Sequence, residues 1–363
     1  MSRFEARPTP AVLLWARQSA GLSLELAAQK AHFKAEQLRS WEEGSGRPSI
    51  AQLRKIAQTY KRPLAAFYLP EPPKRFEVMH DFRRLADEGK HAPTSPGLAQ
   101  EIRAAYDRRE WALELITALE EAVPKFPFEI SPQDNEEEAA LELRRALQVR
   151  PERQATWRDQ YEALRQWRLL LERSGVLTFQ TSHLKLEEAR GFSISLRPLP
   201  VAVVNNKDAP RGRIFTFLHE LSHILLNDGG ICDLHDDEIE AYCNRVASAA
   251  LFPRGELLET ETVRYHGRGD PEWNDEELAA LSRRFGGSRE AALVRLLNLG
   301  LTTQSFFRRK RQEFLAMYQQ QQQQEQAPGF APPHDVNLAS AGPLFTRLVI
   351  ESLNQKKDHN ERR

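Results

Sequence analysis

The feature that most constrains this chain is the run HELSH at residues 219–223, which lies within an apolar stretch over residues 215–226. Residues four apart lie on one face of an α-helix, so a helix here brings the imidazoles of His219 and His223 together. Such a pair is typical of a zinc site, and Glu220 beside it is placed to take a proton from a metal-activated water. The pattern also arises by chance on exposed helices, but the apolar flanks favour a buried helix and a metal site.

A catalytic zinc usually has a third protein ligand. The helical pattern over residues 238–247 places Glu240 and Asn244 on one face, and a carboxylate turned inward is expected to bind a cation. His235, in the preceding stretch, is the alternative third ligand. The predicted set for Zn²⁺ is His219, His223 and Glu240.

The N-terminal 70 residues form a second recognisable segment. Apolar residues recur there at helical spacing, with breaks at Gly21, at His32 and over residues 44–49. Residues 1–62 hold eleven Lys and Arg against five Glu, a net charge of +6, whereas the whole chain is neutral. This basic end favours an anionic partner such as DNA phosphate, and a solvated charged face is the alternative.

Between the two segments the pattern is mostly helical until about residue 174. Strand composition follows over residues 176–179, 192–196 and 201–204. The expected fold class is α+β, mostly helical, with an all-α head followed by a domain that contains a small sheet. The Gln-rich tract over residues 319–324 is expected to be disordered or a fraying helix end, and residues 343–353 form a further possible helix.

Cellular location is constrained mainly by absences in the sequence. No stretch approaches the ~20 apolar residues that a membrane helix needs, and the first residues lack the apolar segment of a secretory signal. Two cysteines are too few for a disulfide framework. We therefore expect a cytoplasmic protein without a membrane partner.

The residues around the histidine pair resemble the ImmA/IrrE family of metallo-endopeptidases. The segments that carry the resemblance are 211–223, 240–244, 249–253, the strand pair 191–193 with 203–205, the helical unit 278–300, and the run DFR at 81–83. The resemblance implies a zincin-like domain with zinc on His219, His223 and Glu240, and with Glu220 as general base. It also implies limited cleavage of a cognate repressor. Cys243 stands where the family tends to have alanine, a departure that leaves the ligand set unchanged.

The N-terminal segment resembles the Cro/C1-type, or Xre-type, helix-turn-helix. Residues 24–31 match its first helix, residues 32–33 its turn and residues 34–42 its recognition helix. The family usually has glycine where His32 stands, and a left-handed turn tolerates another residue at some cost. A helical domain used for protein pairing is the alternative.

In such a fold the start of the second helix enters the major groove of double-stranded, operator-like DNA. The predicted DNA contacts are Lys34, Ala35, Glu36, Arg39 and Arg47. A single head normally binds a near-palindromic site as a dimer, which makes a homodimer a possible form.

Four segments are predicted from these patterns. They are a helix-turn-helix domain over 1–70, a helical linker region over 71–165, a zinc metallopeptidase domain with a C-terminal helical unit over 166–312, and a Gln-rich tract with a tail over 313–363. Residues 275–300 have two interpretations, a second helix-turn-helix or a unit packed on the peptidase core, and the second is favoured.

Two functions follow from the sequence. The first is a DNA-binding zinc endopeptidase that regulates transcription by cleaving a repressor protein. The alternative is an Xre-type regulator whose zinc domain is a sensor or a structural module without proteolysis. Glu220 favours the enzyme, because a purely structural zinc site has no need of a general base.

Overall fold

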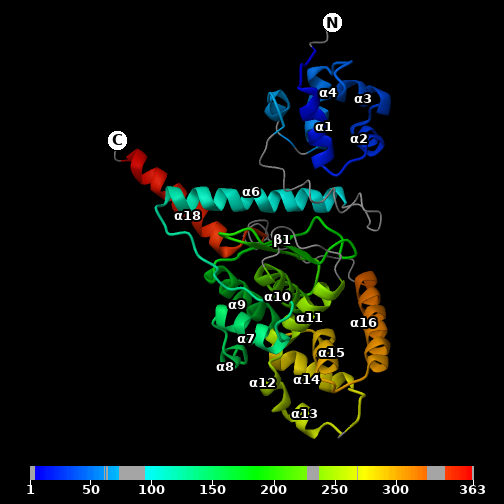
Figure 1. Cartoon of the computed structure of the whole chain (residues 1–363), viewed down its shortest axis with the longest axis vertical. Helices are drawn as coiled ribbons and strands as arrows, with labels where there is room; N and C mark the ends of the chain where they lie inside the picture. The colour runs from blue at the N-terminus through cyan, green and yellow to red at the C-terminus, as the bar shows by residue number, and fades with distance from the viewer. Residues whose placement is uncertain are drawn as a thin grey trace. The chain divides into compact units, whose positions relative to one another are not determined.

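The computed structural model describes residues 5–60, 62, 64–72, 95–226, 237–267, 269–324 and 340–361. The chain divides into two compact units, Met1–Ala104 and Ala105–Arg363. Helices predominate, and the described residues form one three-stranded sheet, in the second unit (Figure 1). The expected α+β, mostly helical fold class is confirmed. The run at residues 81–83 and the alternative ligand His235 lie outside the described residues.

The first unit is a small helical domain. Its elements are α1 (Pro10–Ser19), α2 (Leu24–Ala31), α3 (Ala35–Glu42), α4 (Ile50–Thr59) and the 3-10 helix η1 (Leu64–Tyr68). Ser23 caps α2 by accepting a hydrogen bond from Leu26 N at 3.1 Å, and Ser49 with Gln52 forms a capping box on α4. His32 joins α2 to α3 in the left-handed conformation, with φ 54° and ψ 50°. The turn expected at this position is therefore present without glycine.

A partly buried ion pair sets the position of α3 against α1. Arg17 Nε and Nη2 donate to the two carboxylate oxygens of Glu42 at 2.7 and 3.0 Å. Arg17 Nη1 also donates to the carbonyl oxygen of Leu22 at 2.9 Å. One guanidinium thus ties α3 to α1 and to the turn before α2, in the bidentate geometry that gives such pairs their directional specificity.

The second unit holds the sheet and the remaining helices. Its elements are α6 (Pro96–Ala118, which begins before the division), α7 (Glu136–Ala146), α8 (Pro151–Gln154), α9 (Gln160–Arg173), β1 (Leu177–Thr181), β2 (Gly191–Ile194), β3 (Val201–Asn205), α10 (Pro210–Leu226), α11 (Asp237–Leu251), α12 (Arg254–Leu258), α13 (Glu261–Tyr265), α14 (Asp275–Phe285), α15 (Arg289–Asn298), α16 (Gln304–Gln324) and α18 (Pro343–Glu361). None of the described helices is both long and apolar enough to cross a bilayer.

The sheet has the strand order β1-β3-β2, with β1 parallel and β2 antiparallel to the central strand. Gly191 is paired with Val204, so the strand pair expected from the sequence is present. Every residue of β1 and β3 is buried, because helices cover both faces (Figure 1). On one side Phe345 of α18 packs against Phe179 with ring centroids 5.9 Å apart, and on the other lie α9 and α10.

Helix α7, predicted within a linker region, contributes Ala139, Ala140 and Leu143 to the core of the second unit, and Gln154 of α8 is buried as well. Buried Arg144 donates to the carbonyl oxygen of Ala250 at 2.7 Å and to Gln154 Oε1 at 2.8 Å. Gln154 in turn donates to the carbonyl oxygen of Leu251 at 3.0 Å. These contacts satisfy carbonyl groups at the C-terminal end of α11 and so hold that helix in place.

The helical unit α14–α15 belongs to the same core. Its buried residues include Leu278, Leu281, Ala291 and Leu296. Arg295, on α15, is only 1% exposed and forms a bidentate ion pair with Glu137 at 2.6 and 2.7 Å. The packing interpretation of residues 275–300 is therefore confirmed, because a recognition helix must present its surface to DNA.

The C-terminal part contains two described helices. The Gln-rich tract at residues 319–324 forms the end of α16, one of the two forms expected, and α18 extends to Glu361, beyond the helix expected over residues 343–353. The start of α18 is anchored in the second unit, since Glu172 accepts a hydrogen bond from Leu344 N. Leu348 is fully buried, and Arg347 forms a bidentate pair with Glu121 at 2.7 and 2.8 Å. Tertiary contacts thus stabilise a helix whose sequence is only weakly patterned.

Candidate metal centre

Helix α10 carries the two predicted histidine ligands on one face. Their Nε2 atoms are 3.1 Å apart, and the rings are nearly perpendicular, at 75°. The His219 side chain is 15% exposed and that of His223 is 3% exposed. The helix is buried along its other faces, as the apolar flanks predicted.

Helix α11 brings Glu240 to the same point. Its Oε2 lies 3.2 Å from His219 Nε2, and its Oε1 lies 3.1 Å from His223 Nε2. The three side chains offer ligand atoms that all lie within 4.8 Å of one another. The structure therefore gathers the three residues that the sequence proposed as ligands.

This arrangement fits a divalent cation. The two Nε2 atoms lie 3.1 Å apart, and each lies within 3.2 Å of a Glu240 oxygen, so three atoms of ligand type converge on one point. Two imidazole nitrogens and one carboxylate are a donor set that zinc accepts, leaving a fourth position open. Burial alone would raise the pKa of Glu240, but the hydrogen bonds with His219 and His223 lower it well below the usual range. Glu240 is therefore ionised, as a metal ligand must be.

Glu220 lies in the wall of the same site. Its side chain is buried, and burial raises the pKa of its carboxyl group, while the neighbouring charges of His219 and His223 oppose the shift. A carboxylate whose pKa is raised by burial is a stronger general base than an exposed one. Glu220 can therefore exchange a proton with a group in the site without being a ligand itself.

The site opens into a cavity of about 580 Å³. Its walls come from β2, α10, α11, α15 and α16, five elements spread over more than a hundred residues of the chain. The residues that line it include Phe192, Ser193, Thr216, His219, Glu220, Glu240, Asn244, Ser288, Val294 and Phe307. Strand β2, at the edge of the sheet, forms one side of it. Sequence reasoning expected Asn244 on the ligand face of its helix but assigned no part of this cavity to α15 or α16.

Gly191 is a site residue whose role the sequence did not reveal. A Cβ atom at this position would lie 2.5 Å from Thr216 Cγ2 and 2.7 Å from the carbonyl oxygen of Val203. Such distances are shorter than van der Waals contact, so only glycine lets β2 approach α10 this closely. A glycine within a strand pattern is the signal that could have indicated a close backbone approach.

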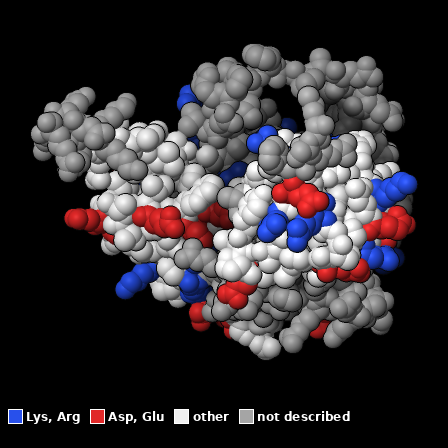
Figure 2. Space-filling view, turned by 90° about the horizontal axis from the view of Figure 1, so that it is seen from above, with Lys and Arg blue, Asp and Glu red and all other residues white. Residues whose placement is uncertain are grey.

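The predicted DNA contacts lie in the first unit, on and beside α3. Lys34 is the residue before the helix, and Lys34, Glu36, Arg39 and Arg47 are exposed, while Ala35 is half-buried. Arg47 Nη1 is 3.7 Å from Glu5 Oε2, an exposed and weak ion pair. Figure 2 shows acidic and basic side chains close together on the face seen from above, as expected for a neutral chain.

Comparisons with known proteins agree with both units. Residues 13–67 match the helix-turn-helix family model, and residues 171–297 match the model of the IrrE N-terminal-like domain. The chain is 35% identical over 106 residues to the radiation response metalloprotease IrrE of Deinococcus deserti. The match covers 26% of this chain and 35% of that protein, so the chain spans about a third of the length of this curated relative. The expected resemblance of the two domains is confirmed.

Proposed function

We propose that this chain, which joins an Xre-type helix-turn-helix domain to an IrrE-like metallopeptidase domain, is a DNA-binding zinc endopeptidase that cleaves a repressor and so regulates transcription. The observation that carries the proposal is the convergence of His219, His223 and Glu240 beside a buried Glu220 in an open cavity. A structural zinc site has four protein ligands and no reason to place a basic carboxylate at its edge.

The chemistry divides between the metal and the chain. Zinc held by His219, His223 and Glu240 would supply a Lewis acid that polarises the scissile carbonyl and makes a water molecule more acidic. Glu220 would accept a proton from the attacking water on a carboxylate oxygen and deliver it to the departing amide nitrogen. The peptide bond then ends as a carboxylate and an amine. The low polarity around Glu220 favours the proton-bound form between these two transfers.

Strand β2 offers a way to hold the substrate. It is an edge strand and lines the cavity beside the ligand helix. An extended peptide laid along such an edge forms main-chain hydrogen bonds whatever its sequence, and pockets for alternate side chains provide the selection. The close approach at Gly191 would keep the bound peptide near Glu220.

The helix-turn-helix unit would bring the peptidase to operator-like DNA. The exposed cations Lys34, Arg39 and Arg47, on and beside α3, suit contacts to phosphates and base edges. Near an operator the local concentration of a DNA-bound repressor is high. This would raise the rate at which a peptidase with few substrates meets and cleaves that repressor.

The test of this function is a search for new protein N-termini. Zinc-loaded wild-type protein and its Glu220→Gln variant are incubated with an extract of cells that lack this protein, and N-termini are mapped by mass spectrometry. We expect cleavage of a few proteins, a DNA-binding repressor among them, by the wild type alone. Identical N-termini in both samples would favour the alternative, a regulator whose zinc domain does not cleave protein.

A further inference from the structure

One wall of the cavity is built by a helix that lies outside the segment matched by the peptidase family. The match ends at residue 297, and α16 begins at Gln304. Phe307 and Arg311 of α16 nevertheless line the cavity that contains the metal ligands. These two residues are four apart and therefore share one face of the helix. This part of the cavity is a property of the present chain that the matched domain does not supply.

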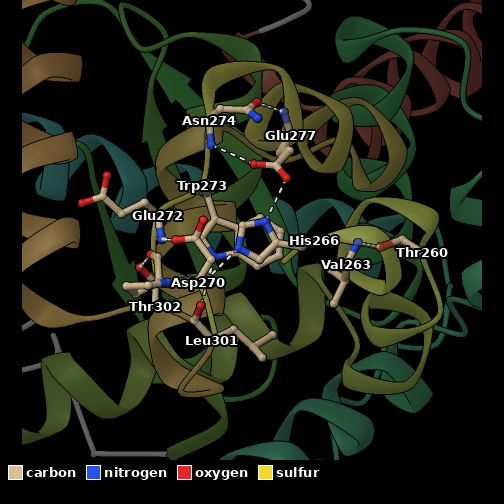
Figure 3. Close-up of polar contacts among 11 residues, drawn as sticks. Thr260, Val263, His266, Asp270, Glu272, Trp273, Asn274, Glu277, Leu301 and Thr302 are labelled. Atoms are coloured by element: carbon tan, nitrogen blue, oxygen red, sulfur yellow. Dashed lines mark hydrogen bonds and ion pairs between the residues drawn. The ribbon is translucent and has the colours of Figure 1, made fainter. Parts of the chain in front are cut away.

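Helix α16 is firmly held in this position. Phe306 and Phe314 are buried in the core, at 5% and 2% exposure. The turn before the helix is anchored twice: Trp273 Nε1 donates to the carbonyl oxygen of Leu301 at 3.0 Å, and Thr302 Oγ1 donates to that of Pro271 at 2.5 Å (Figure 3). A helix fixed in this way can select among substrates, because it presents its cavity-lining residues from a defined position.

The two residues offer different chemistry. Phe307 is half-buried and faces the same cavity as the apolar side chains of Phe215 and Val294, from α10 and α15. Arg311 is 56% exposed, and its Nε lies 3.0 Å from Glu290 Oε1. An ion pair as exposed as this one is weak, so a carboxylate of a bound peptide can compete for the guanidinium.

The other charged groups of the cavity add to this preference. Apart from Glu220 and Glu240, which belong to the metal site, the charged lining residues are Arg190, Arg245, Arg311 and Glu290. Arg190 and Arg245 also lie 3.5 and 3.6 Å from carboxylate oxygens of Asp208 and Glu136, in partly exposed ion pairs. Those two carboxylates do not line the cavity, so guanidinium groups outnumber carboxylates on the surface that a substrate would contact. A peptide with an acidic residue is favoured there over one with a basic residue.

We propose that α16 determines which peptides enter the cavity, with Phe307 contacting an apolar side chain of the substrate and Arg311 binding an acidic side chain near it. This inference rests on the proposed peptidase function and names the substrate class: a segment in which an apolar and an acidic residue flank the cleaved bond.

The test uses full-length, zinc-loaded protein and a proteome-derived peptide library whose cleavage products are sequenced by mass spectrometry. The wild type is compared with Arg311→Glu and with Arg308→Glu. Arg308 is an exposed arginine on the same helix that does not line the cavity, so its variant carries the same charge change. Zinc content and melting temperature are recorded for each protein.

We expect wild-type sites to be enriched in an apolar and an acidic residue. Arg311→Glu should lower kcat/KM for acidic peptides about tenfold and favour basic ones, as the loss of one charge-assisted hydrogen bond implies. Arg308→Glu should cleave as the wild type does, and Phe307→Ala should lose the apolar preference while keeping the acidic one. Equal preferences in wild type and Arg311→Glu would overturn the inference while leaving the peptidase function intact. If the wild type cleaves no peptide, the peptidase function fails, and the inference fails with it.

Discussion

The two units differ in how far apart in the chain their functional residues lie. The predicted DNA-contact residues of the first unit lie within residues 34–47, on one helix and the loop that follows. The cavity of the second unit takes its walls from strand β2 and helices α10, α11, α15 and α16, which span residues 190–311. A local pattern is therefore enough to predict the first surface, whereas the second depends on long-range packing. Substitutions that affect one unit alone test whether the two sites depend on local and on long-range structure in this way.

The largest effects are expected at the metal centre. Glu220→Gln should lower cleavage on the order of 10³-fold, because the general base is lost while the three ligands stay. Glu240→Ala should remove the metal as well as the activity, since two histidines alone hold zinc poorly. Elemental analysis should find about one zinc per chain in the wild type and in Glu220→Gln, and much less in Glu240→Ala. Full zinc occupancy in Glu240→Ala would show that another residue is the third ligand.

The next effect is expected in the first unit, at the ion pair between α1 and α3. Arg17→Ala leaves the carboxylate of Glu42, only 6% exposed, without its bidentate partner, and should destabilise that unit by about 3 kcal/mol. Chemical denaturation should show an earlier transition, and binding to DNA should weaken. Zinc content should not change, because the proposed metal ligands lie in the other unit. A matching loss of zinc would mean that the two units are energetically coupled.

A smaller effect is expected at Gly191. Gly191→Ala places a methyl group against Thr216 and the Val203 carbonyl group, and should cost about 1–3 kcal/mol while widening the gap between β2 and α10. Urea denaturation measures the cost, and kcat/KM should fall with it. Gly255→Ala is the matched control, since a Cβ at Gly255 meets nothing within 4 Å. Equal unfolding free energies and equal kcat/KM values for the two variants would show that Gly191 has no special role in the approach of β2 to α10.

The smallest effect concerns pH and the loop before α14. The ring of His266 stacks on Trp273 at 3.7 Å, its Nδ1 lies 2.8 Å from Glu277 Oε1, and its Nε2 lies 2.9 Å from the carbonyl oxygen of Asp270 (Figure 3). Burial opposes the charged ring, but the bonds to Glu277 and Asp270 outweigh it and raise the pKa of His266 above 6.5. The imidazolium donates both of these hydrogen bonds.

The sign of the pH dependence follows from that shift. A raised pKa in the folded state means that the stabilisation is complete below about pH 6.5 and is lost as the pH rises through the folded-state value. The difference in unfolding free energy between wild type and His266→Gln should therefore be larger at pH 6 than at pH 9. Denaturation curves at several pH values measure it, and a difference that is constant with pH would show that the pKa of His266 is the same in the folded and unfolded states.

Several features were predictable because their signals are local. The spacing of His219 and His223 placed both on one helix face, and Ser23 and His32 marked a helix start and a turn. Glu240 was also predictable, since an acidic residue on the inward face of a helix requires a partner. The packing of α7 into the core of the second unit was not predicted, because amphipathic helices in a linker and in a core share one pattern.

By itself, then, the sequence predicted the elements of the candidate sites: the helix with His219 and His223, Glu220 beside them, the helix that brings Glu240, and the helix-turn-helix. Tertiary structure alone decided what surrounds them. Three contacts join segments that lie tens of residues or more apart in the chain. They are the approach of β2 to α10 at Gly191, the hydrogen bond that anchors α18 at buried Glu172, and the position of Phe307 and Arg311 in the cavity wall. The physical reason is that helical periodicity reports which face of a segment is buried, whereas the partner of that face depends on how the whole core packs.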